Sequence, residues 1–379
     1  MKNNMRNTMK LQKNFLGEHI VSTPSEWCTP AGHACIFPGI CVKPDGTLAM
    51  LAVGGTAFES SDQRTIIATA GADGLSWVSQ GDIGEVRSNG LLFCTSAKPT
   101  ALPDGRIVAI GYGYERDEPE LSISGYAEKY GRFPKVRNYV QFSADGGKTY
   151  SAPRFIEHSY DGIEFSGPAL RLDDGRLLAF GPPFGLKPGE QQIGLCFESQ
   201  DDGQSWKEKS VFHRGGDVTC WECRGAKLAD GAIAVVMWCF DLKENKHLTN
   251  RIAISRDGGA TWKSLDTNLP GQASNLIQLP GGVLGLVQAR REGDRPGVYL
   301  TALKVTENAL EALDTVMLYD AAGGANAKGK ITEQFYNLKF GQPALHRLAD
   351  GSMLLVFWRS PAQDRYEVVV QKLQLTMEA

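Results

Sequence analysis

The chain has 379 residues, of which 42 % are hydrophobic and 22 % charged, and its formal net charge is −3. This composition is typical of a globular protein and excludes a disordered chain or a nucleic-acid binder that relies on bulk positive charge. No apolar run approaches the ~18 residues of a membrane helix and residues 1–15 lack the apolar core of a secretory signal, so we expect a cytoplasmic protein with no membrane partner.

One short phrase recurs six times along the chain. Each copy is an apolar strand, a two-residue Asp-Gly or Gly-Gly turn and a second apolar strand, which predicts a β-hairpin. The copies follow one another at intervals of roughly 50 to 70 residues, with almost no helical periodicity between them. The second glycines of the six turns are Gly46, Gly105, Gly175, Gly231, Gly282 and Gly351. The sequence therefore predicts an all-β fold built from six similar units.

A second phrase falls between the hairpins and reads SADGGKTY at 143–150, SQDDGQSW at 199–206 and SRDGGATW at 255–262. Its aspartate can accept hydrogen bonds from the backbone amides of its own turn, and its terminal aromatic ring can pack in the core below. We expect these aspartates, Asp145, Asp201 and Asp257, to stabilise the fold and to take no part in catalysis. A degenerate copy at 70–77 has Ala72 where the aspartate would stand.

Together the two phrases resemble those of the sialidase superfamily, whose members are six-bladed β-propellers with four-stranded antiparallel blades and Asp boxes of this kind. The resemblance covers roughly residues 30–379. It implies that residues 15–379 form a single six-bladed propeller, that residues 1–14 are a flexible terminus, and that the segment 15–22 supplies the outermost strand of the last blade. It also implies a carbohydrate as the partner, with no cofactor and no nucleic acid.

In such a propeller the first strand of every blade lines the central axis. The residues nine before the six turn glycines are Phe37, Ser96, Ser166, Glu222, Ala273 and Gln342. Two residues further along, on the same inward face by strand alternation, this column adds the cations Lys98 and Arg224. Charges on an inward strand are costly unless the site is wet and used, so these side chains are candidate site residues, with a structural ion pair as the alternative.

The resemblance assigns roles to two carboxylates. Sialidases carry an Asn-Glu element about nine residues before the turn glycine of a middle blade, and WECRGAKLADG places Glu222 there. Their acid/base aspartate follows the second strand of the first blade, where GGTAFESSDQRT offers Glu59 and Asp62, of which Asp62 is the closer positional fit. The resemblance thus implies Glu222 and Asp62 as the catalytic pair.

Other family positions are occupied differently. The family's first two carboxylate-binding arginines align with Ile36 and Trp238, and its nucleophilic tyrosine aligns with Gln342. Only the third arginine has a candidate, Arg290 or Arg291. One guanidinium cannot reproduce a three-arginine clamp on a sialic acid carboxylate, so we expect weak or absent cleavage of sialosides.

The leading hypothesis is an exo-acting glycoside hydrolase that acts on a terminal sugar of an oligosaccharide, with Glu222 as base and Asp62 as acid. Loops on one face bring polar and aromatic groups together, as sugar recognition requires. The candidate substrate-binding residues are Arg224, Lys98, Trp221, Gln342, Arg290, Tyr114, Asp241 and Glu164. Asp161, Glu164 and Asp241 are reserve catalytic carboxylates. Two alternatives stay open: a carbohydrate-binding propeller without catalysis, and a polysaccharide lyase with a tyrosine or histidine base on the same fold.

Eight cysteines are scattered along the chain, and only Cys220 and Cys223 lie close together. No second pair of ligands follows to complete a four-ligand zinc site. We therefore expect reduced, buried thiols and no metal.

Overall fold

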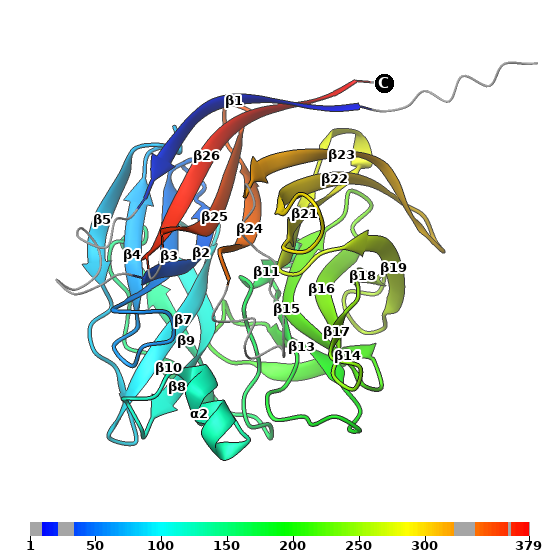
Figure 1. The fold of residues 1–379 in the computed structure, drawn as a ribbon. Helices are drawn as coiled ribbons and strands as arrows, with labels where there is room; N and C mark the ends of the chain where they lie inside the picture. The colour runs from blue at the N-terminus through cyan, green and yellow to red at the C-terminus, as the bar shows by residue number, and fades with distance from the viewer. Residues whose placement is uncertain (1–9, 22–33, 322–337, 363–364, 379) are drawn as a thin grey trace, which may run out of the picture.

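The computed structural model of the protein describes residues 10–21, 34–321, 338–362 and 365–378. Strands make up 59 % of the structure and helices 3 %, which confirms the all-β class. The strands form five hydrogen-bonded sheets (Figure 1). None of the helices within these ranges is long and apolar enough to cross a membrane.

Four of the sheets are antiparallel and follow the chain in order. The second sheet contains β6 (Arg87–Ser88), β7 (Leu91–Ala101), β8 (Ile107–Arg116), β9 (Val136–Ser143) and β10 (Arg154–Ile156). The third contains β11 (Leu170–Arg171), β12 (Leu177–Gly181), β13 (Ile193–Ser199) and β14 (Lys207–Arg214). The fourth sheet contains β15 (Val218–Lys227), β16 (Ile233–Asp241), β17 (Lys246–His247), β18 (Thr249–Ser255) and β19 (Lys263–Pro270). The fifth contains β20 (Ser274–Gln278), β21 (Leu284–Arg290), β22 (Gly297–Val305) and β23 (Leu310–Asp320). A 3-10 turn, η1 (Pro280–Gly282), joins β20 to β21.

The first sheet has eight strands because it joins the two ends of the chain. Its strands are β1 (Lys10–Ile20), β2 (Ala34–Val42), β3 (Leu48–Gly55), β4 (Arg64–Ala70), β5 (Trp77–Asp82), β24 (Phe340–Arg347), β25 (Met353–Ala362) and β26 (Arg365–Glu378). All neighbours are antiparallel except β2 and β26, which meet in parallel at Ala34 and Tyr366. The first and last parts of the chain therefore close on each other.

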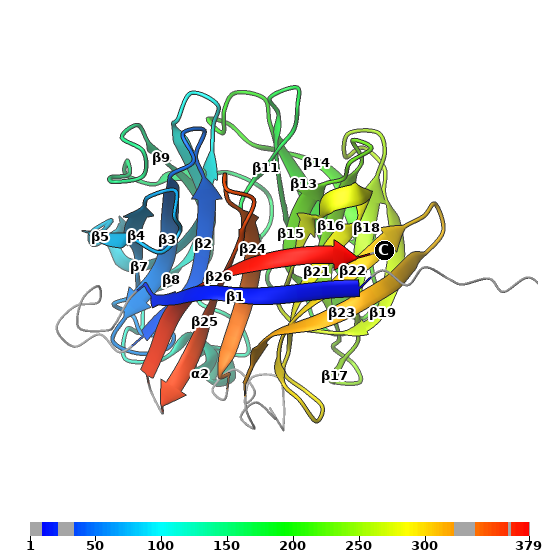
Figure 2. The ribbon, with the colours of Figure 1, turned by 90° about the horizontal axis from the view of Figure 1, so that it is seen from above.

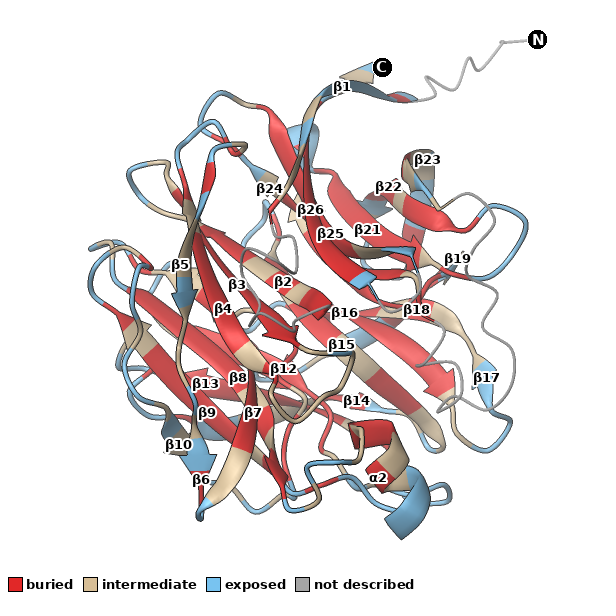
Figure 3. Cartoon of the chain, turned by 60° about the vertical axis from the view of Figure 1, so that its left-hand side comes forward, coloured by how far each residue is buried: buried red, intermediate tan, exposed pale blue. Residues whose placement is uncertain are grey.

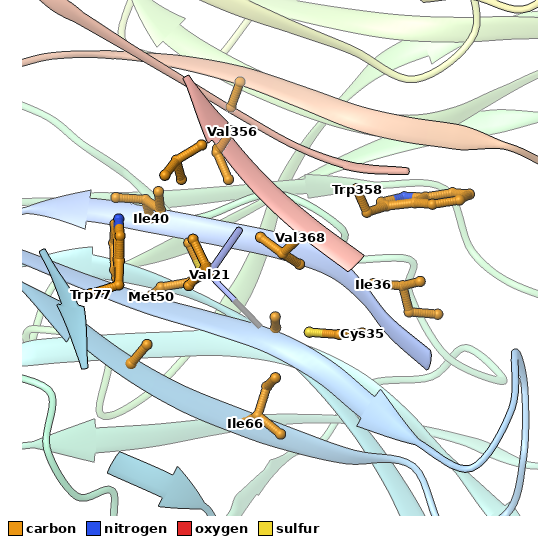
Figure 4. Close-up of a cluster of buried hydrophobic side chains, with 14 of the residues drawn as sticks. Val21, Cys35, Ile36, Ile40, Met50, Ile66, Trp77, Val356, Trp358 and Val368 are labelled. Carbon is orange, nitrogen blue, oxygen red and sulfur yellow. The ribbon is translucent and has the colours of Figure 1, made fainter. Parts of the chain in front are cut away.

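Buried apolar side chains reinforce this closure. In Figure 4, Ile36, Met50 and Ile66 of β2–β4 share one core with Val356 and Val368 of β25 and β26. Figure 3 shows that the strands are largely buried throughout the molecule and that the connections between them are largely exposed. The inner strands also contact one another from sheet to sheet, β2 against β7, β15 against β20 and β20 against β24.

The outermost strand begins earlier than predicted. β1 runs beside β26 along its whole length, from Lys10 opposite Glu378 to Ile20 opposite Val369 (Figure 2). The expected strand is confirmed over its described part, while Ser22 and residues 1–9 of the expected flexible terminus lie outside the described residues. The domain boundary at residue 15 is wrong, because residues 10–14 already belong to the strand and Leu11 is buried.

The hairpin turns have three loop residues rather than the two predicted. In the first, Lys43 N donates to Thr47 O at 2.8 Å and Gly46 N donates to Lys43 O at 2.9 Å, while Gly46 has φ +80°. This is the longer turn in which the last loop residue adopts the left-handed conformation that glycine tolerates best. The same two bonds recur around Gly105, Gly175, Gly231 and Gly351.

The aspartates of the second phrase hold their turns as predicted. The backbone amide of Ser205 donates to Asp201 at 2.9 Å and its hydroxyl donates at 2.6 Å, and Trp206 Nε1 donates to Gly203 O at 3.0 Å. The degenerate copy keeps this role by another residue: Asp73, one position later than expected, accepts from Ser76 N at 3.2 Å. The aspartate was therefore displaced by one position rather than lost.

Replacing Asp257 with alanine should lower the free energy of unfolding by about 1 to 2 kcal/mol. Its carboxylate accepts from Thr261 Oγ1 at 2.5 Å, Thr261 N at 2.9 Å and Ser255 Oγ at 2.8 Å, and these bonds hold the pKa below its usual range. Because the folded pKa is lowered, this stability is complete above about pH 4 and disappears as the pH falls through the folded pKa. Urea unfolding at pH 7 and pH 3 measures it, with Asp294→Ala as the exposed control; equal losses in both variants would contradict the role.

One helix was missed by the sequence analysis. α2 (Ile123–Tyr130) lies in the long excursion after β8, at the opposite edge of the molecule from β1 (Figure 1). Ser122 caps it by accepting from Gly125 N at 2.9 Å, and Gly131 ends it with φ +67°. The signals that could have revealed it are this cap and the following glycine, nine residues apart.

Of the eight cysteines, the seven in the described residues are free and buried, as predicted. Cys223 Sγ lies 3.3 Å from the carbonyl oxygen of Cys220. Burial raises the pKa of both thiols. They pack as small apolar side chains within the fourth sheet.

Candidate active site

A cavity of about 790 Å³ opens where the inner strands of three sheets meet α2. Its walls come from β2 and β24, from β7 and β8, from β15 and β16, and from the segments before and after β12. Among the candidate residues it is lined by Trp221, Glu222, Gln342, Tyr114, Glu164 and Asp161. A deep cavity with a few converging polar groups is the usual form of a small-ligand site.

Three of the six residues that stand nine before the turn glycines have an unusual backbone conformation. Phe37, Glu222 and Gln342 have φ values of +54°, +48° and +47°, and each sits where the pairing of its strand with the next shifts register. Such bulges re-aim a side chain, and a positive φ in a residue other than glycine costs conformational energy. These three and Ser96 line the cavity as the column predicts, whereas Ser166 and Ala273 do not.

Glu222 accepts hydrogen bonds on both carboxylate oxygens. Gln342 Nε2 donates to Oε1 at 3.1 Å, and the Arg224 guanidinium lies 3.4 Å from Oε2. The side chain remains 13 % exposed. It is therefore oriented from two sides and still open to the cavity.

Arg224 and Lys98 lie behind the cavity wall rather than on it. Arg224 is buried and donates to the backbone oxygens of Glu222 at 2.8 Å and Ser166 at 3.2 Å, and Lys98 donates to Phe37 O. Burial, with the nearby Arg224 charge, lowers the pKa of Lys98 to about 7 against the opposing effect of Glu222. They therefore do not line the cavity, where the sequence analysis expected them to bind substrate, because backbone oxygens bind these side chains within the wall.

Glu164 stands beside Glu222 in the cavity. Its backbone is fixed by a bond from its amide to Pro182 O at 2.9 Å. Burial, followed by the negative charge of Glu222, raises the pKa of its carboxyl to about 8, although Arg224 and a backbone hydrogen bond from Glu222 act in the opposite direction. At neutral pH Glu164 therefore carries a proton next to a carboxylate that accepts hydrogen bonds.

Asp62 does not line the cavity. Its carboxylate accepts from Thr56 N at 3.1 Å and Ser60 Oγ at 2.5 Å, both in its own loop. Burial acts to raise its pKa, but the bonds from Ser60 and Thr56 outweigh it and hold the pKa below the usual range. A carboxylate in this state holds the loop together and is a poor proton donor, which argues against the predicted role as acid.

Asp241 and Arg290 are likewise absent from the described lining of the cavity. Asp241 accepts from the backbone amides of Lys243 at 3.0 Å and Glu244 at 2.9 Å. The Arg290 guanidinium lies 4.5 Å from the centre of the Tyr299 ring. Both were expected to contact substrate, and both instead stabilise local structure.

Arg291, the neighbour of Arg290, lines the cavity. Its Nε donates to Phe340 O at 3.0 Å and its guanidinium lies 5.6 Å from the Trp238 ring centre. Burial lowers its pKa to about 10, against the effect of Glu222. The alignment with the third arginine had left the two neighbours open, and the geometry selects Arg291.

The aromatic lining was only partly foreseen. Trp221 stacks on Phe240 with ring centres 5.0 Å apart, and presents its remaining surface to the cavity. Tyr114 lies on β8 with Tyr112, and both contact Phe184, which the sequence analysis did not single out. Phe184 follows a Pro-Pro pair, and this position in a connecting loop carries no sequence signal for a site.

Comparisons with known proteins were made against this geometry. No family model matches the chain, and no curated protein is similar to it in sequence. Among solved structures, it is similar to a protein of unknown function from Dyadobacter fermentans, at 16 % identity and a TM-score of 0.73, over 96 % of this chain and 99 % of the other. An α-L-arabinanase from Penicillium chrysogenum, complexed with arabinobiose, matches at 13 % identity and a TM-score of 0.61, over 94 % and 98 % of the two chains.

A sialidase from Streptococcus pneumoniae matches at 13 % identity and a TM-score of 0.61, over 93 % of this chain and 70 % of the sialidase. The fold is that of a sialidase-like β-propeller. At these identities the similarity establishes the fold alone, and the chemistry has to be argued from the cavity.

Proposed function

We propose that the protein is an exo-acting glycoside hydrolase that releases a terminal sugar, with Glu164 and Glu222 as its carboxyl pair. The observation that carries this proposal is that the two carboxyl groups differ in state. Glu164 holds a proton at neutral pH, and Glu222 accepts hydrogen bonds on both oxygens. Glycosidases need such a pair, an acid for the leaving oxygen and a carboxylate for the anomeric carbon. Solved enzymes with this fold include glycosidases.

In this mechanism Glu164 donates its proton to the glycosidic oxygen as the bond breaks. Glu222 faces the developing positive charge at the anomeric carbon and acts on that carbon directly or through a water molecule. Gln342 and Arg224 keep the Glu222 carboxylate in place, so no reorganisation is needed as the charge develops. Asp62 is replaced by Glu164 as the proposed acid.

The proposal includes the assignment of the fold as a six-bladed propeller. The eight-stranded sheet divides at its parallel junction into two antiparallel groups, β24-β25-β26 with β1, and β2-β3-β4-β5. With the four other sheets this makes six groups, one for each hairpin phrase. The three full copies of the aspartate phrase are then the Asp boxes of the middle blades.

The cavity favours a neutral sugar over a sialic acid. The described lining contains two guanidinium groups, Arg132 at the mouth and Arg291, whose pKa the charge of Glu222 affects, whereas the lining carboxyls are Glu59, Asp161, Glu164 and Glu222. Gln342 stands where sialidases carry their tyrosine and is bound to Glu222. The arabinanase among the similar structures makes an arabinosyl terminus the first substrate to test.

A substrate screen tests the proposal by reaction class. We expect release of arabinose from arabinobiose and from short arabinan chains, and little turnover of aryl sialosides. Burial and neighbouring negative charges raise the pKa of Tyr112 and Tyr114 well above the usual value, which weighs against a tyrosine base. An unsaturated product from uronate polymers would point to a lyase, and binding of sugars with no release would point to a carbohydrate-binding propeller; either result would contradict a hydrolase.

A further inference from the structure

The mouth of the cavity carries exposed aromatic side chains. Within the described residues only five large apolar side chains are exposed, and two of them, Tyr130 and Phe133 at 42 % and 39 %, line the cavity at the end of α2. The other three lie on β1 and β5, away from it. Exposing an aromatic ring to water is unfavourable in free energy. Two such rings at the mouth of a cavity therefore point to a ligand that covers them.

These rings continue into the cavity without interruption. Phe133 packs edge-on against Phe184 with ring centres 5.8 Å apart, and Phe184 contacts Tyr112 at 5.4 Å. Tyr112 in turn lies near enough to Glu164 and Glu222 for their charges to raise its pKa, after the larger effect of burial. A line of aromatic faces therefore leads from the mouth to the carboxyl pair.

Hydrogen bonds join the segments that form the mouth. Glu59, from the loop after β3, accepts from Ser124 N at 2.8 Å and Ser124 Oγ at 3.0 Å at the start of α2. The Arg116 guanidinium donates to Leu121 O and to Glu59 O, joining the same two segments. A surface that is ordered before binding loses little conformational entropy when a ligand settles on it.

The outer part of the described lining includes the aromatic mouth. It comes from Phe58, Glu59 and Gln63, from α2 to Phe133, from residues 182–188, and from Gln192, Leu242 and Leu338. An oligosaccharide whose terminal sugar lies between Glu164 and Glu222, and which leaves on the side of α2, passes between α2 and residues 182–188. The second sugar is then next to Phe133 and Phe184, where an aromatic ring can cover the apolar face of a pyranose or furanose ring.

We propose that Tyr130, Phe133 and Phe184 form a second subsite that binds the sugar next to the terminal one in a linear neutral oligosaccharide. The subsite rests on the proposed function and narrows it: the preferred substrate is a chain of at least two sugars rather than a simple glycoside. Arg132 and Lys187 in the same lining supply hydrogen-bond donors to the hydroxyl groups.

The test compares two substrates that share a terminal sugar. Arabinobiose fills both positions, whereas arabinofuranosyl fluoride has a one-atom leaving group and fills only the first. In Phe133→Ala the ratio of kcat/KM for arabinobiose to that for the fluoride should fall about tenfold, and Phe133→Trp should preserve it. Phe15→Ala removes an exposed phenylalanine outside the cavity and is the control.

A binding measurement separates the subsite from the chemistry. Calorimetric titration with arabinobiose should give a Kd about ten times higher for Glu222→Gln/Phe133→Ala than for Glu222→Gln, with Tyr130→Ala as a second variant if Phe133→Ala does not fold. An unchanged ratio and an unchanged Kd in an active enzyme would overturn the subsite alone. If the parent protein neither binds nor cleaves arabinobiose, the subsite and the arabinosyl hydrolase are both overturned.

Discussion

Replacing Glu164 with glutamine should lower kcat/KM for arabinobiose by about 10²- to 10⁴-fold, the usual contribution of a general acid. Glutamine keeps the shape of the side chain but cannot give an acidic proton to the leaving oxygen. The loss should be much smaller for arabinofuranosyl fluoride, because fluoride leaves with little help from protonation. Initial rates on the two substrates measure the contrast.

Asp62→Asn is the matched variant for this experiment, because Asp62 is the acid that the family alignment suggests. Its carboxylate is bound by Thr56 and Ser60 of its own loop and does not reach the cavity, so we expect kcat/KM within a few-fold of the parent and a small loss of stability. A deep loss in Asp62→Asn with an active Glu164→Gln would reverse the two assignments.

Arg224→Met should lower the free energy of unfolding by about 3 to 5 kcal/mol, the range for removing one partner of a buried ion pair. Arg224 is buried at 4 % exposure. Its guanidinium donates to the backbone oxygen and the carboxylate of Glu222 and to the carbonyl oxygen of Ser166. Methionine fills the space but leaves these oxygens without their donor. Denaturant unfolding of the two proteins measures the difference.

Two controls make this result specific. Arg290→Met, which removes a half-buried guanidinium stacked on Tyr299, should cost far less. Glu222→Gln should change stability by only about 1 kcal/mol while turnover falls by about 10²- to 10⁴-fold. A Glu222→Gln protein that is strongly destabilised but keeps its activity per folded molecule would make Glu222 a structural partner of Arg224 and remove it from the mechanism.

The repeat in the sequence was enough to locate two polar residues that line the cavity. Counting back from each turn glycine found Glu222 and Gln342, because the hairpins keep a constant distance between the turn and the axis. The same count placed Arg224 on the inward face, but the register shift between Trp221 and Arg224 interrupts strand alternation. Arg224 therefore lies behind the wall, where it supports Glu222.

Glu164 could be named from the sequence but not given its role. It lies before β11, a strand of only two residues, so no alternation connects it to the turn glycine of its blade. Its raised pKa comes from burial and from Glu222, which is 58 residues away in the chain. The sequence placed Asp62 at the site because position along the chain does not reveal that a loop folds around its own carboxylate.

The excursion after β8 is a further feature that could not be predicted from the sequence. Its short helix has few apolar residues at helical spacing, and its place at the cavity depends on the distant contact between Glu59 and Ser124. A short helix of this kind is stabilised mainly by tertiary contacts. The aromatic mouth formed by Phe133 and Phe184 could therefore be recognised only in the folded protein.

The pH dependence of kcat/KM for arabinofuranosyl fluoride and arabinobiose tests the central claim, that Glu164 is the acid, most directly. Glu164 is protonated below its pKa of about 8 and loses its proton above it, so for arabinobiose kcat/KM should fall about tenfold per pH unit above pH 8. Lys98 has a pKa of about 7 and lies behind the cavity wall, so the assignment depends on Glu164→Gln, whose residual activity on arabinobiose should show no such decline. The fluoride should give a nearly level profile in both proteins, because its departure needs little protonation. A decline that persists in Glu164→Gln, or activity on arabinobiose that stays level up to pH 10 in the parent protein, would contradict the account.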